Sequence, residues 1–179
     1  MLIVPFLIGI LVLVAWAVVI PNLPDTPPFG PDLPWLSETL PPSQIEALKR
    51  TAATNLARPR LFDVQARSLK KLAAAGVRIA FGTDAGIGAP YGWSAHAEIA
   101  DMVTAGMTPM QVVVAATRTS AEILKLDLLG TIASGKSADF IVLDANPLDE
   151  ITNTRRIADV YLRGRHIDRK SLSRNWTGR

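Results

Sequence analysis

A short apolar stretch that ends on a carboxylate constrains this chain more than any other feature. Val77, Ile79 and Phe81 recur at the period of two that is typical of a β-strand. Asp84 follows directly, in a turn that its neighbouring glycines make possible. The pattern predicts a strand over 77–81 with Asp84 at its C-terminal end, which is the catalytic edge of a (β/α)8 barrel. A cap on the next turn is the alternative role for Asp84.

The composition allows one domain and argues against several classes of function. The chain has 179 residues, whereas a typical (β/α)8 barrel has roughly 250. Its net charge of +3 is modest and its Lys and Arg residues are scattered, so we expect no nucleic-acid partner. The sequence has no cysteine, which excludes a disulfide framework and thiolate chemistry.

The first twenty residues form a separate apolar segment. Residues 1–20 contain no charged side chain, and an apolar stretch of this length can cross a bilayer as a helix. The alternatives are an uncleaved signal and a strand that belongs to a partial barrel. An anchor or signal would make the protein membrane-associated or exported, with membrane contact through 1–20; otherwise we expect a cytoplasmic protein.

Proline separates this segment from the rest of the chain. Eight prolines exclude a regular helix or a central strand over 21–42, where we expect a long loop. Ser43 begins a capping-box pattern, which predicts a helix to about Leu56. Asp63 is expected to cap a second helix, and Gly76 is expected to end it.

The remainder of the chain changes from helical to strand-like patterns. Thr108 and Gln111 form a second capping box around Pro109, which predicts a helix to about Leu124. Beyond this helix we expect a small antiparallel sheet. Its predicted strands are 130–132, 139–143 and 157–162.

A series of short motifs, in a fixed order, resembles one known family. The motifs are Gly76–Gly86, His96–Glu98, Ala105–Pro109, Ala115–Thr117, Ser120–Ala121, Gly130–Ile132, Gly135–Phe140 and Asp144–Leu148. Each motif alone is weak, but the whole series at these spacings is specific. On these residues the chain resembles the C-terminal part of a metal-dependent amidohydrolase, of the imidazolonepropionase-like and prolidase-like branch.

The resemblance implies a fold and a division of the chain. We expect an α/β chain that forms the C-terminal part of a (β/α)8 TIM barrel over 43–128. Half of the small β-sandwich that flanks this barrel is then expected over 129–170, followed by a tail over 171–179.

The resemblance also implies a chemistry. In the family, the residue that matches Asp84 lies beside the metal and acts as general base, taking a proton from metal-bound water and passing it to the leaving amine. Asp84 is therefore the expected catalytic residue and the only family metal ligand in this chain. His96 is expected near the mouth of the pocket as a substrate contact; a helix N-terminal histidine without that contact is the alternative. The implied substrate is a small amide or a dipeptide, and the implied cofactor is zinc or a similar divalent ion.

The sequence lacks residues that would complete such a metal site. A hydrolytic zinc site needs about three protein ligands, but the sequence has two histidines, His96 and His166, and no His-x-His pair. Three hypotheses follow: an amidohydrolase that cleaves a carbon–nitrogen bond, an inactive and membrane-tethered remnant, or a chain whose metal ligands come from a partner chain. An open barrel edge also predicts a homo-oligomer or poor solubility.

Overall fold

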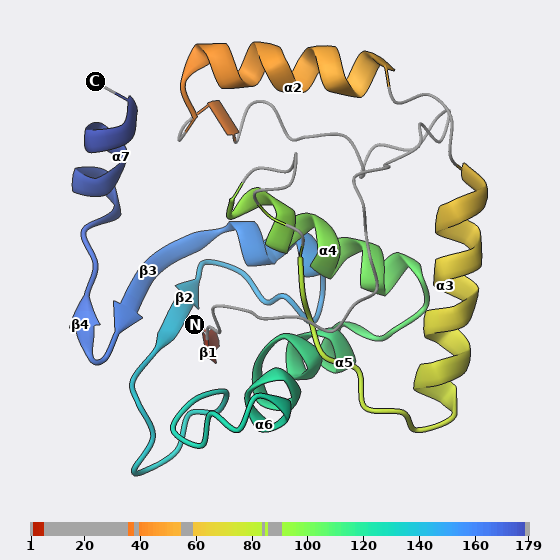
Figure 1. Ribbon diagram of the computed structural model, residues 1–179. Helices are drawn as coiled ribbons and strands as arrows, with labels where there is room; N and C mark the ends of the chain where they lie inside the picture. The colour runs from red at the N-terminus through yellow and green to blue at the C-terminus, as the bar shows by residue number, and fades with distance from the viewer. Residues whose placement is uncertain are drawn as a thin grey trace.

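The computed structural model describes most of the chain, namely residues 2–5, 36–37, 40–54, 59–83, 85 and 91–177. The elements in these residues are β1 (Leu2–Pro5), α2 (Pro42–Thr54), α3 (Pro59–Ala74), α4 (Trp93–Thr104), α5 (Pro109–Val114), the π-helical turn η1 (Ala115–Thr119), α6 (Ser120–Ile123), β2 (Phe140–Leu143), the 3₁₀ turn η2 (Ile151–Arg155), β3 (Ile157–Leu162), β4 (Arg165–His166) and α7 (Arg169–Thr177). Figure 1 shows α4 in the middle of the molecule, with the strands to one side of it and α3 to the other. The chain therefore mixes helices and strands, as predicted.

The strands form one antiparallel sheet in the order β1-β2-β3-β4. The predicted strands over 139–143 and 157–162 are confirmed as β2 and β3. Phe140 and Tyr161 face each other across these two strands, and their rings stack with centroids 4.6 Å apart. β3 turns into β4 through Arg163 and Gly164, whose φ angles of 51° and 76° suit the twist of a tight hairpin.

β1 lies within the apolar segment 1–20. Leu2–Pro5 pairs with β2, so these residues form a sheet strand rather than the start of a membrane helix. The rest of the segment and the proline-rich stretch up to residue 35 lie outside the described residues. In the part of the chain that the structure describes, no helix is both long enough and apolar enough to span a membrane.

The prediction of a strand over 130–132 is wrong, because the chain turns and bends there. Gly130 has a φ of +84°, which is incompatible with an extended strand. The backbone also lies very close to the helix before it: a Cβ placed on Gly130 would be 2.6 Å from the Ala121 Cβ and 2.9 Å from the Thr117 carbonyl oxygen. Close packing against η1 and α6 therefore sets the conformation at this position.

Three of the described helices, α2, α3 and α5, begin at prolines. α2 begins at Pro42, close to the predicted start, and its Ile45 is buried with Trp93 in a small apolar cluster. α3 begins at Pro59, where the fixed φ of proline suits the first turn of a helix. The prediction that Asp63 caps this helix is wrong, because Asp63 lies inside it.

The helix predicted from Thr108 to about Leu124 is present, with one interruption. Its capping box is complete: the Gln111 N–H donates to Thr108 Oγ1 at 3.2 Å, and the Thr108 N–H donates to Gln111 Oε1 at 2.8 Å. The helix continues as α5, η1 and α6 to Ile123. The π-helical turn η1 in its middle was not expected from the sequence.

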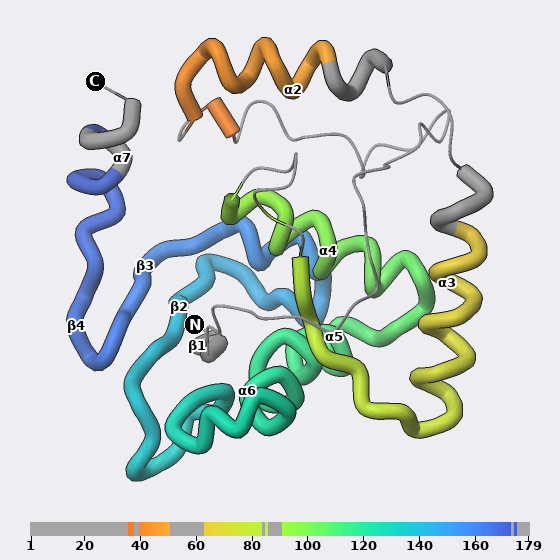
Figure 2. The backbone as a smooth tube through the Cα atoms, viewed as in Figure 1, coloured from red at the N-terminus to blue at the C-terminus, as the bar shows by residue number. Residues whose placement is uncertain are grey.

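A core cluster joins α4 and α5 to the chain that leaves α3. Its buried members are Phe81, Met102, Met107, Val112 and Ala115. Figure 2 shows the chain leaving the lower end of α3 and passing α5 toward α4. The apolar side chains of this passage, above all Phe81, therefore hold the segment in place.

The segment from Val77 to Thr83 is extended, but the strand predicted over 77–81 is not formed. A strand requires a neighbour that accepts and donates its backbone hydrogen bonds, and none of the described strands pairs with this segment. The described sheet is antiparallel throughout. The partial barrel over 43–128 and the half-sandwich over 129–170 remain predictions.

Candidate active site

The segment that carries the candidate site begins at a well-defined helix end. The Gly76 N–H donates to the Ala73 carbonyl at 3.1 Å, and the Val77 N–H donates to the Leu72 carbonyl at 3.0 Å. Gly76 has a φ of 75°, which lies in the left-handed region that glycine favours. The two hydrogen bonds around it form a common kind of α-helix end. The predicted stop at Gly76 is confirmed, and it directs the chain out of α3 into the extended segment.

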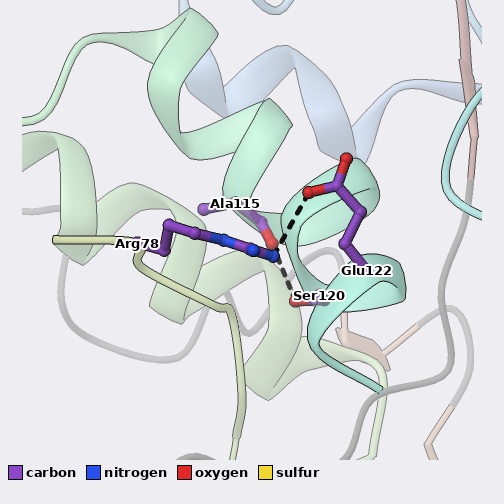
Figure 3. Close-up of polar contacts among 4 residues, drawn as sticks. All are labelled: Arg78, Ala115, Ser120 and Glu122. Carbon is purple, nitrogen blue, oxygen red and sulfur yellow. Dashed lines mark hydrogen bonds and ion pairs between the residues drawn. The ribbon is translucent and has the colours of Figure 1, made fainter. Parts of the chain in front are cut away.

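Two contacts attach this segment to the helix α5–η1–α6. The Phe81 N–H donates to the buried Ser120 Oγ at 3.0 Å. Closer to solvent, an Arg78 Nη2 lies 3.2 Å from a Glu122 carboxylate oxygen. Figure 3 shows the Arg78 side chain reaching across to Glu122, with Ser120 bonded to the Ala115 carbonyl beside this pair. The segment is therefore attached both in the core and at the surface.

The chain turns at the end of this segment. The Ala85 N–H donates to Thr83 Oγ1 at 3.4 Å, a long hydrogen bond that spans position 84. Threonine hydroxyls often close such turns by bonding the backbone two residues on. Asp84 itself lies outside the described residues, so its roles as catalytic base and as metal ligand remain predictions.

His96 lies in the first part of α4 and faces the C-terminal region. Its Nδ1 is 3.1 Å from Thr154 Oγ1, and Thr154 is buried in η2. Burial is the main reason that the pKa of His96 falls to about 4, and the positive charges of Arg155 and Arg169 lower it further. The imidazole is therefore neutral near pH 7. Its predicted contact with substrate remains a prediction.

The sequence analysis missed Asp101, a second titratable group of α4. Asp101 is only 5% exposed, and burial raises the pKa of its carboxyl to about 7. The positive charge of Arg155 opposes this rise, and Arg155 lies on η2, which packs against α4. A signal was available, because Asp101 stands between Ala100 and Met102 in the part of α4 that is otherwise apolar.

Comparison with known proteins identifies the family. The pattern of the amidohydrolase family matches residues 19–167, which is most of the chain. The chain belongs to the amidohydrolase family. The match begins well before the motifs that the sequence analysis used, and it includes the whole proline-rich stretch 21–42. No curated protein matches the chain significantly.

Several solved structures are similar to this amidohydrolase chain. A Xaa-Pro dipeptidase with bound methionine is 33% identical, with a TM-score of 0.53 over 68% of this chain and 28% of the dipeptidase. A molinate hydrolase is 30% identical, with a TM-score of 0.55 over 75% of this chain and 32% of the hydrolase. A prolidase complexed with N-methylphosphonate-L-proline is 27% identical, with a TM-score of 0.50 over 71% of this chain and 29% of the prolidase. The chain thus spans about a third of the length of each relative or less.

Amidohydrolases generally depend on metal ions, but the described residues of this chain do not fit one. Among the described residues, no three side chains of His, Cys, Asp or Glu lie close enough together to hold a metal ion. His96 is bonded to Thr154. His166 Nε2 lies 2.9 Å from an Asp159 carboxylate oxygen, so it contacts the sheet at β3. Both histidines of the sequence therefore have other contacts.

Proposed function

We propose that this chain supplies the proton-transferring carboxylate of an amidohydrolase that cleaves a carbon–nitrogen bond in a small amide or a dipeptide. Asp84 is that carboxylate. The observation that carries the proposal is the attachment of residues 77–83, which runs from the glycine stop at Gly76 to the turn at Thr83. A base must be held within about 3 Å of the proton that it takes, and an anchored segment can hold one there.

The comparisons support the substrate class. The similar structures include a Xaa-Pro dipeptidase and a prolidase bound to a phosphonate derivative of proline. These names are those of enzymes that act on dipeptides. A molinate hydrolase is also among the similar structures. A dipeptide or a related small amide is therefore the first substrate class to test on this chain.

The proposed role of Asp84 is proton transfer in two directions. As a carboxylate it accepts a proton from the water that attacks the scissile carbonyl carbon. As a carboxylic acid it then donates this proton to the nitrogen that leaves. Such positioned acid–base catalysis contributes roughly 10²-fold to 10⁴-fold to a rate.

We further propose that the metal ligands come from a second polypeptide chain. This part of the proposal is supported by the two histidines, because His96 bonds Thr154 and His166 bonds Asp159.

The test uses the full chain in two samples. In the first sample the chain is expressed alone. In the second it is co-expressed with the part of the Xaa-Pro dipeptidase that this chain does not match. Both samples are incubated with Zn²⁺ and assayed on a panel of Xaa-Pro dipeptides and N-acyl amino acids. We expect hydrolysis by the co-expressed complex and none by the chain alone, which should also retain no stoichiometric zinc. In the complex, Asp84→Asn should lower kcat by about 100-fold or more.

Asp63→Asn serves as the matched control, because Asp63 is an exposed carboxylate on α3. It should leave the rate unchanged. A folded complex that hydrolyses no member of the panel overturns the proposed hydrolase function. Equal rates for the wild type and Asp84→Asn overturn the role of Asp84. Stoichiometric zinc and turnover in the chain alone overturn the second-chain proposal and leave the hydrolase function standing.

A further inference from the structure

Ser120 makes three hydrogen-bonding contacts at the point where the candidate site segment meets the helix, of which the one to the Phe81 carbonyl oxygen is long at 3.5 Å. Its Oγ accepts a bond from the Phe81 N–H at 3.0 Å and donates one to the Ala115 carbonyl at 2.7 Å. Only 3% of Ser120 is exposed. A hydroxyl can accept one bond while it donates another, which neither alanine nor a purely accepting group can do.

Ser120 directly follows the π-helical turn η1. A π-helical turn contains one more residue than an α-helical turn, and such turns are frequent at functional sites. η1 ends at Thr119, and Ser120 is the first residue of α6. A second hydroxyl, that of Thr117 within η1, donates to the Val113 carbonyl of α5 at 2.6 Å. Side-chain hydroxyls therefore bond to the backbone both within the irregular turn and directly after it.

The turn is also fixed from its other side. Gly130 packs so closely on η1 that an added Cβ would lie 3.1 Å from Arg118 Cα and 2.9 Å from the Thr117 carbonyl oxygen. The segment 77–83 contacts the helix through Ser120 itself, and the chain at Gly130 contacts it through residues next to Ser120, namely Thr117, Arg118 and Ala121.

We propose that Ser120 is a positioning residue, whose hydroxyl bond to the Phe81 N–H fixes the turn that carries Asp84. The bond lies three residues before Asp84, and only Gly82 and Thr83 stand between. The proposal rests on the proposed catalytic role of Asp84. The exposed pair Arg78–Glu122 holds the same segment, but its side chains are 59% and 54% exposed, and exposed ion pairs contribute little.

The first test measures the bond itself by amide hydrogen exchange in the full chain. Ser120→Ala should lower the protection of the Phe81 amide by about 10-fold, the amount that the loss of one hydrogen bond predicts. Ser120→Thr keeps the hydroxyl and should restore protection. Glu122→Gln is the matched control, because it removes the exposed contact to the same segment and should leave the Phe81 amide protected. If Ser120→Ala does not fold, Ser120→Cys keeps the side-chain volume with only a weak donor.

The second test asks whether the bond acts on Asp84. Amide hydrogen exchange at Thr83 and Ala85, whose backbone flanks Asp84, should be faster in Ser120→Ala and should keep the wild-type rate in Ser120→Thr. In the co-expressed complex, Ser120→Ala should lower kcat by about 10-fold to 100-fold with little change in KM, because a misplaced base affects the chemical step.

Each outcome decides a separate point. A Phe81 amide that stays protected in Ser120→Ala overturns the proposal, whatever the activity. Lost protection at Phe81 with unchanged exchange at Thr83 and Ala85 overturns it as well. If the amides of Phe81, Thr83 and Ala85 all respond but the wild-type complex hydrolyses nothing, the proposed function fails while the positioning role of Ser120 stands.

Discussion

His96 and Asp101 lie five positions apart on α4, and burial moves their pKa values in opposite directions. The pKa of His96 falls from 6.5 to about 4, and that of Asp101 rises from 3.8 to about 7. Arg155 lowers both pKa values, since a positive charge disfavours the imidazolium and favours the carboxylate. The two groups therefore give the free energy of unfolding opposite dependences on pH.

For His96, the unfolded chain binds the proton more readily than the folded chain between pH 4 and 6.5, so its contribution to stability is lost as the pH falls through this window. For Asp101, the folded chain keeps the proton that the unfolded chain has released between pH 3.8 and 7, so stability falls as the pH rises.

We expect Asp101→Asn to gain stability relative to the wild type as the pH rises to about 7. We expect His96→Gln to gain stability relative to the wild type as the pH falls from 6.5 to about 4.

Urea unfolding at the two ends of these windows, followed by the fluorescence of the buried Trp93, measures both effects. Asp63→Asn controls for the loss of a carboxylate at an exposed position. If the curves of Asp101→Asn and the wild type stay parallel across the range, the Asp101 carboxyl titrates normally and the prediction is wrong.

The sequence predicts some of these residues and not others. Asp84 and His96 follow from motifs that are local in the sequence. Ser120 lies in one of these motifs too, but its bond to Phe81 and the electrostatic effect of Arg155 on Asp101 each join residues that are far apart in the sequence. No periodicity contains that information.

At the scale of single elements, the capping box at the start of α5 offers a direct test. Thr108→Ala removes the Oγ1 that accepts the Gln111 N–H and should lower the free energy of unfolding by about 1 kcal/mol. Thr108→Ser keeps the oxygen and should unfold like the wild type. The measurement is the urea midpoint of the three proteins. Equal midpoints for Thr108→Ala and the wild type would show that the cap does not contribute.

Two element predictions were right because their signal is local, and two were wrong because the conformation depends on neighbours; the cap predicted at Asp63 has a local signal and was wrong, since α3 already begins at Pro59. The stop at Gly76 and the cap at Thr108 depend on bonds within a few residues, and both are present. The segment 77–81 has a strand pattern but no paired neighbour among the described strands. Residues 130–132 are held as a turn by contact with η1 and α6, which the sequence does not reveal.

At the scale of the whole molecule, large apolar side chains remain exposed beyond α6. Leu128 is 63% exposed and Ile132 is 58% exposed. We expect the double variant Leu128→Lys, Ile132→Lys to self-associate less than the wild type, because exposed apolar surface promotes association. Light scattering on a sizing column measures this effect. The matched control is the double variant Ala133→Lys, Ser134→Lys, which adds the same charge at exposed positions that carry small or polar side chains. If both double variants reduce self-association equally, the added charge alone explains the change.

The pairing of β1 with β2 has a consequence for how the chain is made. Leu2 pairs with Leu143, so β1 must wait for a partner strand that is synthesised about 140 residues later. At typical rates of synthesis of 5 to 20 residues per second, that delay is on the order of ten seconds. During this time the α-helical turns can form from local contacts, whereas the sheet cannot close on this side. Until β2 has been synthesised, β1 is a strand without a partner, and it is open to any chaperone that binds extended apolar peptides.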